Sequence, residues 1–223
     1  MRERPIRFNG AMVRAILSGA KTQTRRAIKD QPTLPTEHWQ QCRGRWMGTG
    51  TSRATGGIHQ TWGWAECPFG QPGDRLWVRE TTVKVEEHGY VGPVYAASDE
   101  GRTILNYGLA PDPDDCIEVE PEELRLRPSI HMPRSMCRLV LEITAVRVER
   151  LQAISEADAE AEGTNPVAAK VPTHRDAFRY LWGDTGGDWE SNPWVWVIGF
   201  RLLEAGQNHA ASDTTKETRD GRS

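Results

Sequence analysis

The sequence lacks most of the patterns by which common classes of protein are recognised. Its 223 residues contain no run of about 18 apolar residues and no hydrophobic N-terminal stretch, so neither a membrane span nor a signal peptide is predicted. The GxGxxG, Walker, HExxH and GxSxG patterns are absent, and with them the commonest signatures of cofactor binding and hydrolysis. We therefore expect a cytoplasmic protein that uses no cofactor and does not contact a membrane.

Cysteine is scarce as well, and no two cysteines form a CxxC pair. The four are Cys42, Cys67, Cys116 and Cys137, a scattered set that predicts no disulfide in a reducing cytosol. Cys42, His59 and Cys67 are an alternative zinc set. Because zinc ligands normally occur as pairs two to four residues apart, no metal site is predicted.

Charge of one sign is not in large excess, because 28 basic and 31 acidic residues give a formal net charge of −3. Bulk attraction to nucleic acid is therefore not expected. The first 30 residues differ from the rest, since Glu3 and Asp30 are their only acidic residues and the basic ones are Arg2, Arg4, Arg7, Arg14, Lys21, Arg25, Arg26 and Lys29. This asymmetry predicts a local surface that faces phosphate, with an ordinary solvated face as the alternative.

What is present is a series of short strands and helices. Asn9 as an N-cap and apolar residues at helical spacing predict a helix over residues 9–19, ended by Gly19. Further helices are predicted over residues 155–162 and 174–182, and strands over residues 22–28, 75–81, 138–150 and 193–203. Apolar residues change parity after Ile143, which predicts a bulge in that strand.

Two long polar segments interrupt these elements. Residues 31–66 show no sustained period and are predicted to form an insertion or long loop, and residues 82–127 a flap or loop with some strand content. Residues 205–223 are polar and predict a disordered tail. The predicted fold class is α+β, with residues 1–204 as a single domain: a mixed β-barrel with short flanking helices and two polar insertions.

The ordered set of motifs resembles the ASCH family, a branch of the PUA-like β-barrels. The motifs are residues 17–26, 73–76, 141–148 and the short acidic helix after Ser155. With residues 128–133 and 192–196 included, the chain is similar to the larger ASCH proteins of bacteriophages and prophages, some of which are labelled morphogenetic proteins. The resemblance covers about residues 4–30, 67–81 and 128–203.

The resemblance implies that RNA or a modified nucleobase binds beside the first helix. One small bacterial member of the family is an amidohydrolase that acts on N4-acetylcytidine and has a similar Gly-x-Lys-Thr-x-Thr segment. Carried over to this chain, the resemblance implies Lys21 as base, Thr24 as nucleophile and Glu162 as the carboxylate; the other acidic residues of that helix, Glu156, Asp158 and Glu160, are alternatives. The rival hypothesis is a non-catalytic phage structural or host-interaction protein that uses the insertions as contact surfaces.

Chemistry sets two conditions on these residues. A threonine hydroxyl needs a base, and a lysine serves as one only if burial or a nearby cation, such as Arg25 or Arg26, lowers its pKa. In a regular strand the side chains of Lys21 and Thr24 would lie on opposite faces. We therefore expect Lys21 in the turn that follows Gly19.

Other polar residues are candidates for contact with a substrate or a nucleic acid. The predicted set is Arg25, Arg26, Arg79, Glu80 and His131. A structural ion pair is the alternative for Arg79 with Glu80, and a structural role is the alternative for His131. Tryptophans of the strands are candidates for stacking on a base or, alternatively, for the core.

Overall fold

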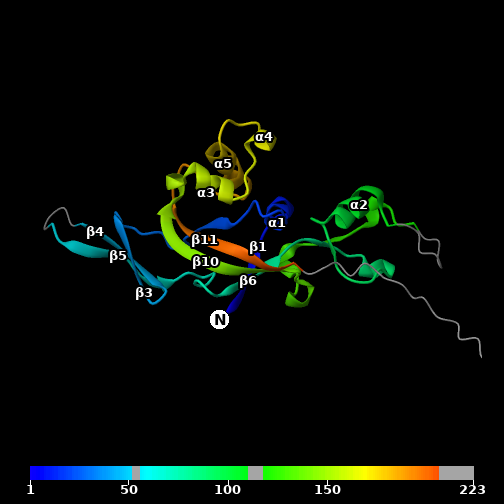
Figure 1. The fold of residues 1–223 in the computed structure, drawn as a ribbon, viewed down its shortest axis with the longest axis horizontal. Helices are drawn as coiled ribbons and strands as arrows, with labels where there is room; N and C mark the ends of the chain where they lie inside the picture. Colours follow the sequence, from blue (N-terminus) through cyan, green and yellow to red (C-terminus); the bar gives the residue numbers. More distant parts are fainter. Residues whose placement is uncertain (52–55, 110–117, 206–223) are drawn as a thin grey trace, which may run out of the picture.

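The computed structural model describes residues 1–51, 56–109 and 118–205, and its centre is a five-stranded sheet (Figure 1). The strand order is β1 (Glu3–Arg7), β6 (Arg75–Arg79), β10 (Leu139–Arg150), β11 (Trp194–Ala205) and β2 (Gln23–Ala27). β1 and β6 are parallel, and the other neighbours are antiparallel. The class is α+β, as predicted. The described strands do not close into the predicted barrel, because β1 and β2 remain the edges of the sheet.

The sheet is nevertheless strongly curved, and its two edges are linked by a side chain. β10 bends visibly along its length (Figure 1) and shifts register against β11 between Ile143 and Ala145. That shift confirms the predicted bulge, which lets a strand turn a corner. A guanidinium nitrogen of Arg26 on β2 donates to the carbonyl oxygen of Arg7 on β1 at 2.7 Å.

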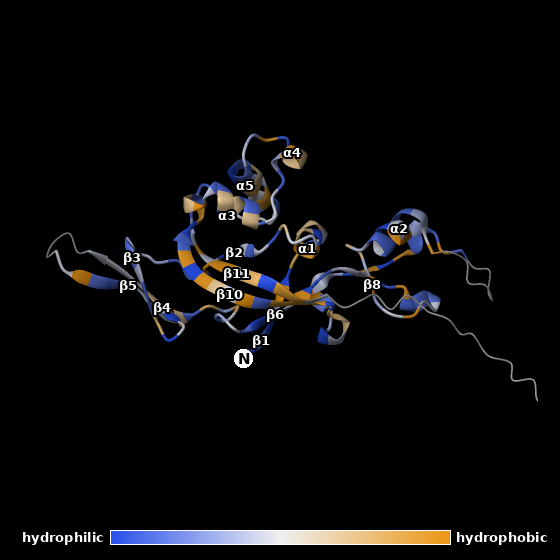
Figure 2. Cartoon of the chain, in the orientation of Figure 1, coloured by the Kyte–Doolittle hydropathy of each residue, from blue (hydrophilic) through white to orange (hydrophobic). Residues whose placement is uncertain are grey.

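The two faces of the sheet carry two separate hydrophobic clusters. Alternate residues of β11 divide between them, as the pleat requires: Trp196 and Ile198 pack in the cluster that includes Val13 of α1 (Gly10–Leu17), whereas Val197 packs with Phe178 of α5 (His174–Asp184). We call these the α1 face and the α5 face. Figure 2 shows the apolar residues along β10 and β11 at the middle of the molecule.

The first helix and its ends match the sequence prediction. Asn9 caps α1 by accepting a hydrogen bond from the backbone amide of Met12. Gly19 has a φ of 77°, a left-handed conformation that glycine adopts without strain. The amide of Lys21 then donates to the carbonyl oxygen of Ala15 at 2.9 Å, and this turn leads the chain into β2.

The acidic helix is also present as predicted. Ser155 caps α3 (Glu156–Ala161) by accepting from the Asp158 amide, and Glu162 is the C-cap. The Asn165-Pro166 turn begins one further short helix, α4 (Pro166–Ala169), before α5. A 3-10 turn, η5 (Leu151–Ala153), connects β10 to α3. The α3, α4 and α5 helices lie together on one side of the sheet (Figure 1).

Of the two alternatives predicted for residues 31–66, an insertion or a long loop, the long loop is wrong. β3 (His38–Cys42), β4 (Arg45–Thr51) and β5 (Ile58–Glu66) form an antiparallel sheet. Three of its tryptophans, Trp39, Trp46 and Trp62, pack edge-on against those of β11, and the ring centroids of Trp39 and Trp194 lie 5.3 Å apart. The apolar partner of this sheet is thus β11, which is remote in sequence. Periodicity within residues 31–66 alone therefore does not indicate that β11 is the packing partner.

The second insertion is a folded unit with its own core. β7 (Thr82–Val83) pairs with β8 (Val94–Tyr95) and β9 (Leu126–Arg127), and α2 (Asp99–Tyr107) packs beside them. This core contains Val83, Val85, Val94, Ile104, Leu109 and Val119. The strand content was predicted, whereas α2 was not. The insertion also contains the 3-10 turns η1 (Glu86–His88) and η2 (Pro121–Glu123). Two further 3-10 turns, η3 (Ser129–His131) and η4 (Arg134–Met136), follow it before β10.

No helix in the described ranges is long and apolar enough to cross a membrane. The predicted disordered tail lies outside the described residues, apart from Ala205.

Candidate functional site

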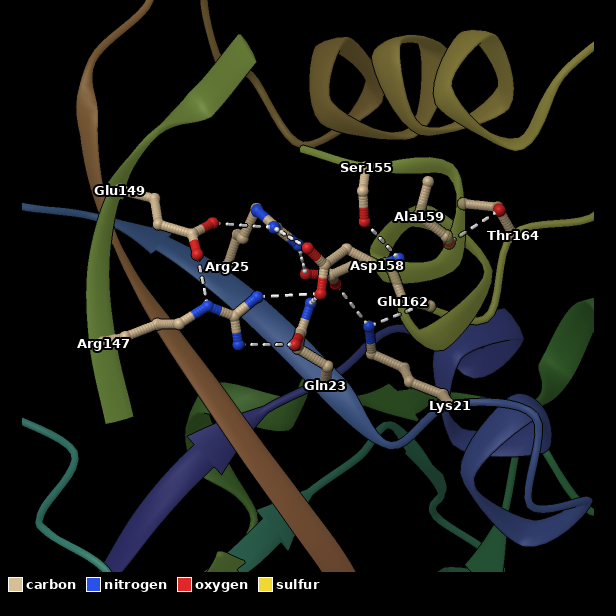
Figure 3. A network of polar contacts seen from close by, with 10 residues as sticks. All are labelled: Lys21, Gln23, Arg25, Arg147, Glu149, Ser155, Asp158, Ala159, Glu162 and Thr164. Atoms are coloured by element: carbon tan, nitrogen blue, oxygen red, sulfur yellow. Dashed lines mark hydrogen bonds and ion pairs between the residues drawn. The ribbon is translucent and has the colours of Figure 1, made fainter. Parts of the chain in front are cut away.

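Lys21 and Glu162 meet at the buried end of a polar cluster (Figure 3). The Lys21 ammonium lies 2.8 Å from Oε2 of Glu162 and also donates to its backbone carbonyl oxygen at 2.7 Å. Both residues are almost fully buried, with exposures of 2% and 3%. Their backbones pair as an isolated antiparallel bridge. The structure therefore brings together two of the three predicted catalytic residues.

The pairing follows from the periodicities of a strand and a helix. Gln23 and Arg25 lie opposite Gly199 and Val197 of β11, which places them on the α5 face. Lys21 precedes Gln23 by two residues, and its side chain is turned to the same helix, α3. On α3, Asp158 and Glu162 are four residues apart and therefore share one side. The Asp158 and Glu162 carboxylates therefore lie over the side chains of Lys21, Gln23 and Arg25.

Arg25 is the hub of the cluster. Its guanidinium lies 3.2 Å from Oε1 of Glu162, 3.2 Å from Glu149 and 3.4 Å from Asp158. Arg147 binds Asp158 at 2.7 Å and also contacts Glu149. Three cations (Lys21, Arg25, Arg147) thus meet three carboxylates (Glu149, Asp158, Glu162), so their formal charges cancel.

Burial and these partners shift the pKa values of the cluster. Burial lowers the pKa of Lys21 because it disfavours the ammonium; the nearby charges of Arg26 and Arg25 act in the same direction, and Glu162 opposes them. Burial alone would raise the pKa of Asp158. Hydrogen bonds from Arg147 and Gln23 outweigh it and lower that pKa to about 2. A lysine base needs a lowered pKa and a position near the threonine. The lowered pKa of Lys21 meets the first of these conditions.

Thr24 lies on the other face of the strand. It pairs with Ile198, which belongs to the α1 face, and it is 3% exposed. Among the described residues, no hydrogen bond joins its hydroxyl to Lys21 or Glu162. Lys21 does follow the turn after Gly19, as expected. Its side chain, however, is directed to Glu162 on α3 (Figure 3).

Phe8 connects Lys21 to the face that carries Thr24. Its ring is part of the α1-face cluster, and its centroid lies 5.7 Å from the Lys21 ammonium and 5.3 Å from the Arg26 guanidinium. Arg26 pairs with Trp196 and is on the same face as Thr24. Burial lowers the pKa of Arg26. The amine of Lys21 therefore lies at the boundary between the ion cluster and the α1 face.

The predicted contact residues Arg79 and Glu80 do not pair with each other. Glu80 is buried and accepts two hydrogen bonds from Arg138, at 2.9 and 2.8 Å. Arg79 donates to the carbonyl oxygen of Ile130 and lies 5.4 Å from the Trp77 ring. His131 is exposed on η3. Glu80 thus forms a structural ion pair, but with Arg138 and not with Arg79. Arg79, Glu80 and His131 do not join the Lys21 cluster.

Sequence reasoning missed Gln23, Arg147 and Glu149 and treated Asp158 only as an alternative to Glu162. The signal was present in the spacing. Lys21, Gln23 and Arg25 alternate, as do Arg147 and Glu149, which is the pattern of polar residues on one face of a strand. What alternation does not reveal is that an acidic helix covers this face.

The alternative zinc set does not assemble. Within the described part of the chain, no group of three or more His, Cys, Asp or Glu side chains is arranged to hold a metal ion. Cys42 is exposed and Cys67 is buried. Burial raises the pKa of the Cys67 thiol to about 11, so it is neutral at pH 7.

Comparison with known proteins gives a distant structural neighbour. No family model and no curated protein matches the sequence. Among solved structures, the chain is similar to the crystal structure of protein EF3133 from Enterococcus faecalis V583, of the family model DUF984. The identity is 10%, the TM-score is 0.37, and the match covers 95% of this chain and 86% of that one.

Proposed function

We propose that this protein is an ASCH-type, PUA-like protein that binds a nucleobase or RNA on the α1 face of β2, beside Phe8. One observation carries the proposal: Lys21 is buried between the carboxylate of Glu162 and the ring of Phe8, within the segment that resembles the ASCH motif. The contact of Arg26 with Arg7, which links the sheet edges, supports a barrel-like architecture.

A narrower form of the proposal is an amidohydrolase for N4-acylated cytosine nucleosides. The Thr24 hydroxyl attacks the acyl carbon and passes its proton to the amine of Lys21, which has first released its own proton to water. The C–N bond then breaks, the cytosine amine takes that proton, and water hydrolyses the threonyl ester. The lowered pKa of Lys21 supports this role. The step requires the Lys21 amine to turn from Glu162 towards Thr24, past the ring of Phe8.

Binding is tested by titrating the protein with short single-stranded RNA and with modified cytidines. We expect wild type to bind and Lys21→Ala to lose at least about tenfold in affinity, the worth of one charge-assisted hydrogen bond. Lys29→Ala is the matched control, because Lys29 is exposed and carries the same charge. Unchanged binding in Lys21→Ala contradicts the proposed site.

Hydrolysis is tested by incubating the protein with N4-acetylcytidine and measuring the release of cytidine. Thr24→Ala should abolish the release, because it removes the nucleophile. Thr22→Ala is the control, since Thr22 is exposed two residues away. No release by folded wild type rejects the hydrolase and leaves the binding function to be judged by titration.

A host-interaction or phage structural function is the second candidate. It is favoured by the insertions, which are folded units rather than loops and which expose large side chains such as Val91 and Tyr107. The RNA and cytidine titration separates the two functions: a folded wild type that binds none of these ligands favours the interaction function.

A further inference from the structure

Three arginines around the end of β1 differ from those of the ion cluster. Among the described residues, Arg7, Arg26 and Arg79 form no ion pair with a carboxylate. On the α5 face, by contrast, every cation of the cluster has at least one carboxylate partner. These three arginines therefore carry positive charge that no carboxylate of the described residues pairs with.

Backbone contacts hold the three arginines together. Arg7 and Arg79 are partners in the parallel pairing of β1 and β6, and the amide of Phe8 donates to the Arg79 carbonyl oxygen at 3.3 Å. Arg26 reaches the same place from β2, where it donates to the Arg7 carbonyl oxygen at 2.7 Å. Residues from both sheet edges thus meet at the dipeptide Arg7-Phe8.

Donor groups remain unused at this place. The Nε atoms of Arg26 and Arg79 are buried and have no hydrogen-bond partner among the described residues. A guanidinium has five N–H donors, and a buried donor without an acceptor destabilises a protein. The Arg7 side chain is exposed; burial lowers the pKa of Arg26, the charge of Glu162 opposes this, and the charge of Arg7 lowers the pKa further. An anion bound beside them would accept hydrogen bonds from the exposed Arg7 guanidinium and relieve the repulsion between like charges.

We propose that Arg7 and Arg26 bind a phosphate group of the ligand, so that the site selects a phosphorylated nucleotide or RNA over a free nucleoside. This inference rests on the proposed nucleobase-binding function and names its substrate class. Arginine suits the role because its planar fork of N–H groups binds phosphate oxygens in pairs. Lys21 is held by Glu162 and Arg25 by three carboxylates, so neither is available for this contact.

The experiment compares the affinities of wild type for cytidine, cytidine 5′-monophosphate and a cytidine dinucleotide. We expect the monophosphate to bind about tenfold more tightly than cytidine at low salt, with a preference that falls as salt is raised. The dinucleotide distinguishes a terminal phosphate from the phosphodiester of RNA. Arg7→Ala should reduce the ratio of the two affinities towards one. It is the variant of choice because Arg7 is exposed.

Arg179→Ala is the matched control, because Arg179 is exposed on α5 and the same charge is lost. Its affinity ratio should equal that of wild type. Equal affinities of wild type for cytidine and its monophosphate, or a preference that persists in Arg7→Ala, overturn the phosphate site and leave the proposed function standing. No binding of any of the three ligands overturns both.

Discussion

The ammonium of Lys21 lies 2.8 Å from a carboxylate oxygen of Glu162, although the two residues are 141 positions apart in the chain. The contact joins the end of α3 to the start of β2. Removing two charges from water is costly, and such a pair is tolerated when further hydrogen bonds satisfy both groups. Here the Glu162 carbonyl oxygen accepts from Lys21, and Arg25 binds the second carboxylate oxygen.

Neutralising Glu162 should destabilise the protein strongly. Glu162→Gln leaves Lys21 buried without its carboxylate, and breaking one side of a buried ion pair typically costs about 3–5 kcal/mol. Chemical denaturation measures the change in the free energy of unfolding. Glu160→Gln on the same helix is the control, because Glu160 is exposed. A loss in Glu162→Gln no larger than in Glu160→Gln would show that the pair is not structurally required.

Gly163 is predicted to resist substitution because Lys21 approaches it closely. Gly163 has a φ of 78°, and an added Cβ would lie 2.9 Å from the Cβ atoms of Lys21 and Ala15. Gly186 has a φ of 80° with nothing within 4 Å of its added Cβ. Gly186→Ala should therefore cost about 1 kcal/mol from backbone strain. Gly163→Ala should cost at least about 1 kcal/mol more, because a packed contact must move.

Thermal or chemical denaturation of the two glycine variants measures this difference. Equal losses in both would mean that the backbone conformation, and not the approach of Lys21, explains the glycine at position 163.

Asp158 should make stability depend on pH in the acid range. Its folded pKa is about 2, below its ordinary 3.8, so its contribution is complete above about pH 4 and is lost as the pH falls towards 2. Asp158→Asn removes this contribution, and its free energy of unfolding should decline less steeply between pH 4 and pH 2. Urea denaturation at each pH measures the slope. Asp184→Asn, at an exposed position of α5, should retain the wild-type slope, and identical slopes in all three proteins would contradict the assignment.

The first insertion should depend on its tryptophan contacts with β11. Trp46 is 9% exposed, and its ring centroid lies 6.2 Å from that of Trp196. Trp46→Ala should lower the free energy of unfolding by about 3–5 kcal/mol, as is typical for a buried aromatic residue. Trp64→Ala in the same sheet should cost less than about 1 kcal/mol, since Trp64 is 38% exposed. A loss in Trp46→Ala as small as that in Trp64→Ala would mean that this sheet does not contribute to the core.

Local signals predicted four of the five strands of the central sheet, β2, β6, β10 and β11, whereas β1 was not predicted. Asn9 and Ser155 as caps, Gly19 as a helix end and the parity change after Ile143 all have local causes, and all are present in the structure. The insertions were predicted less well. The sheet of β3, β4 and β5 is completed by tryptophans of β11, and the core beside α2 gathers residues from Val83 to Val119.

The sequence by itself determined where Lys21 lies, because a helix that ends at Gly19 must turn before β2 begins. The alternation of Lys21, Gln23 and Arg25 also followed from the sequence. Only the tertiary structure decided that α3 covers this row and that Glu162 pairs with Lys21, because helix placement depends on packing between segments distant in sequence. The same packing leaves Thr24 on the opposite face, beside Ile198.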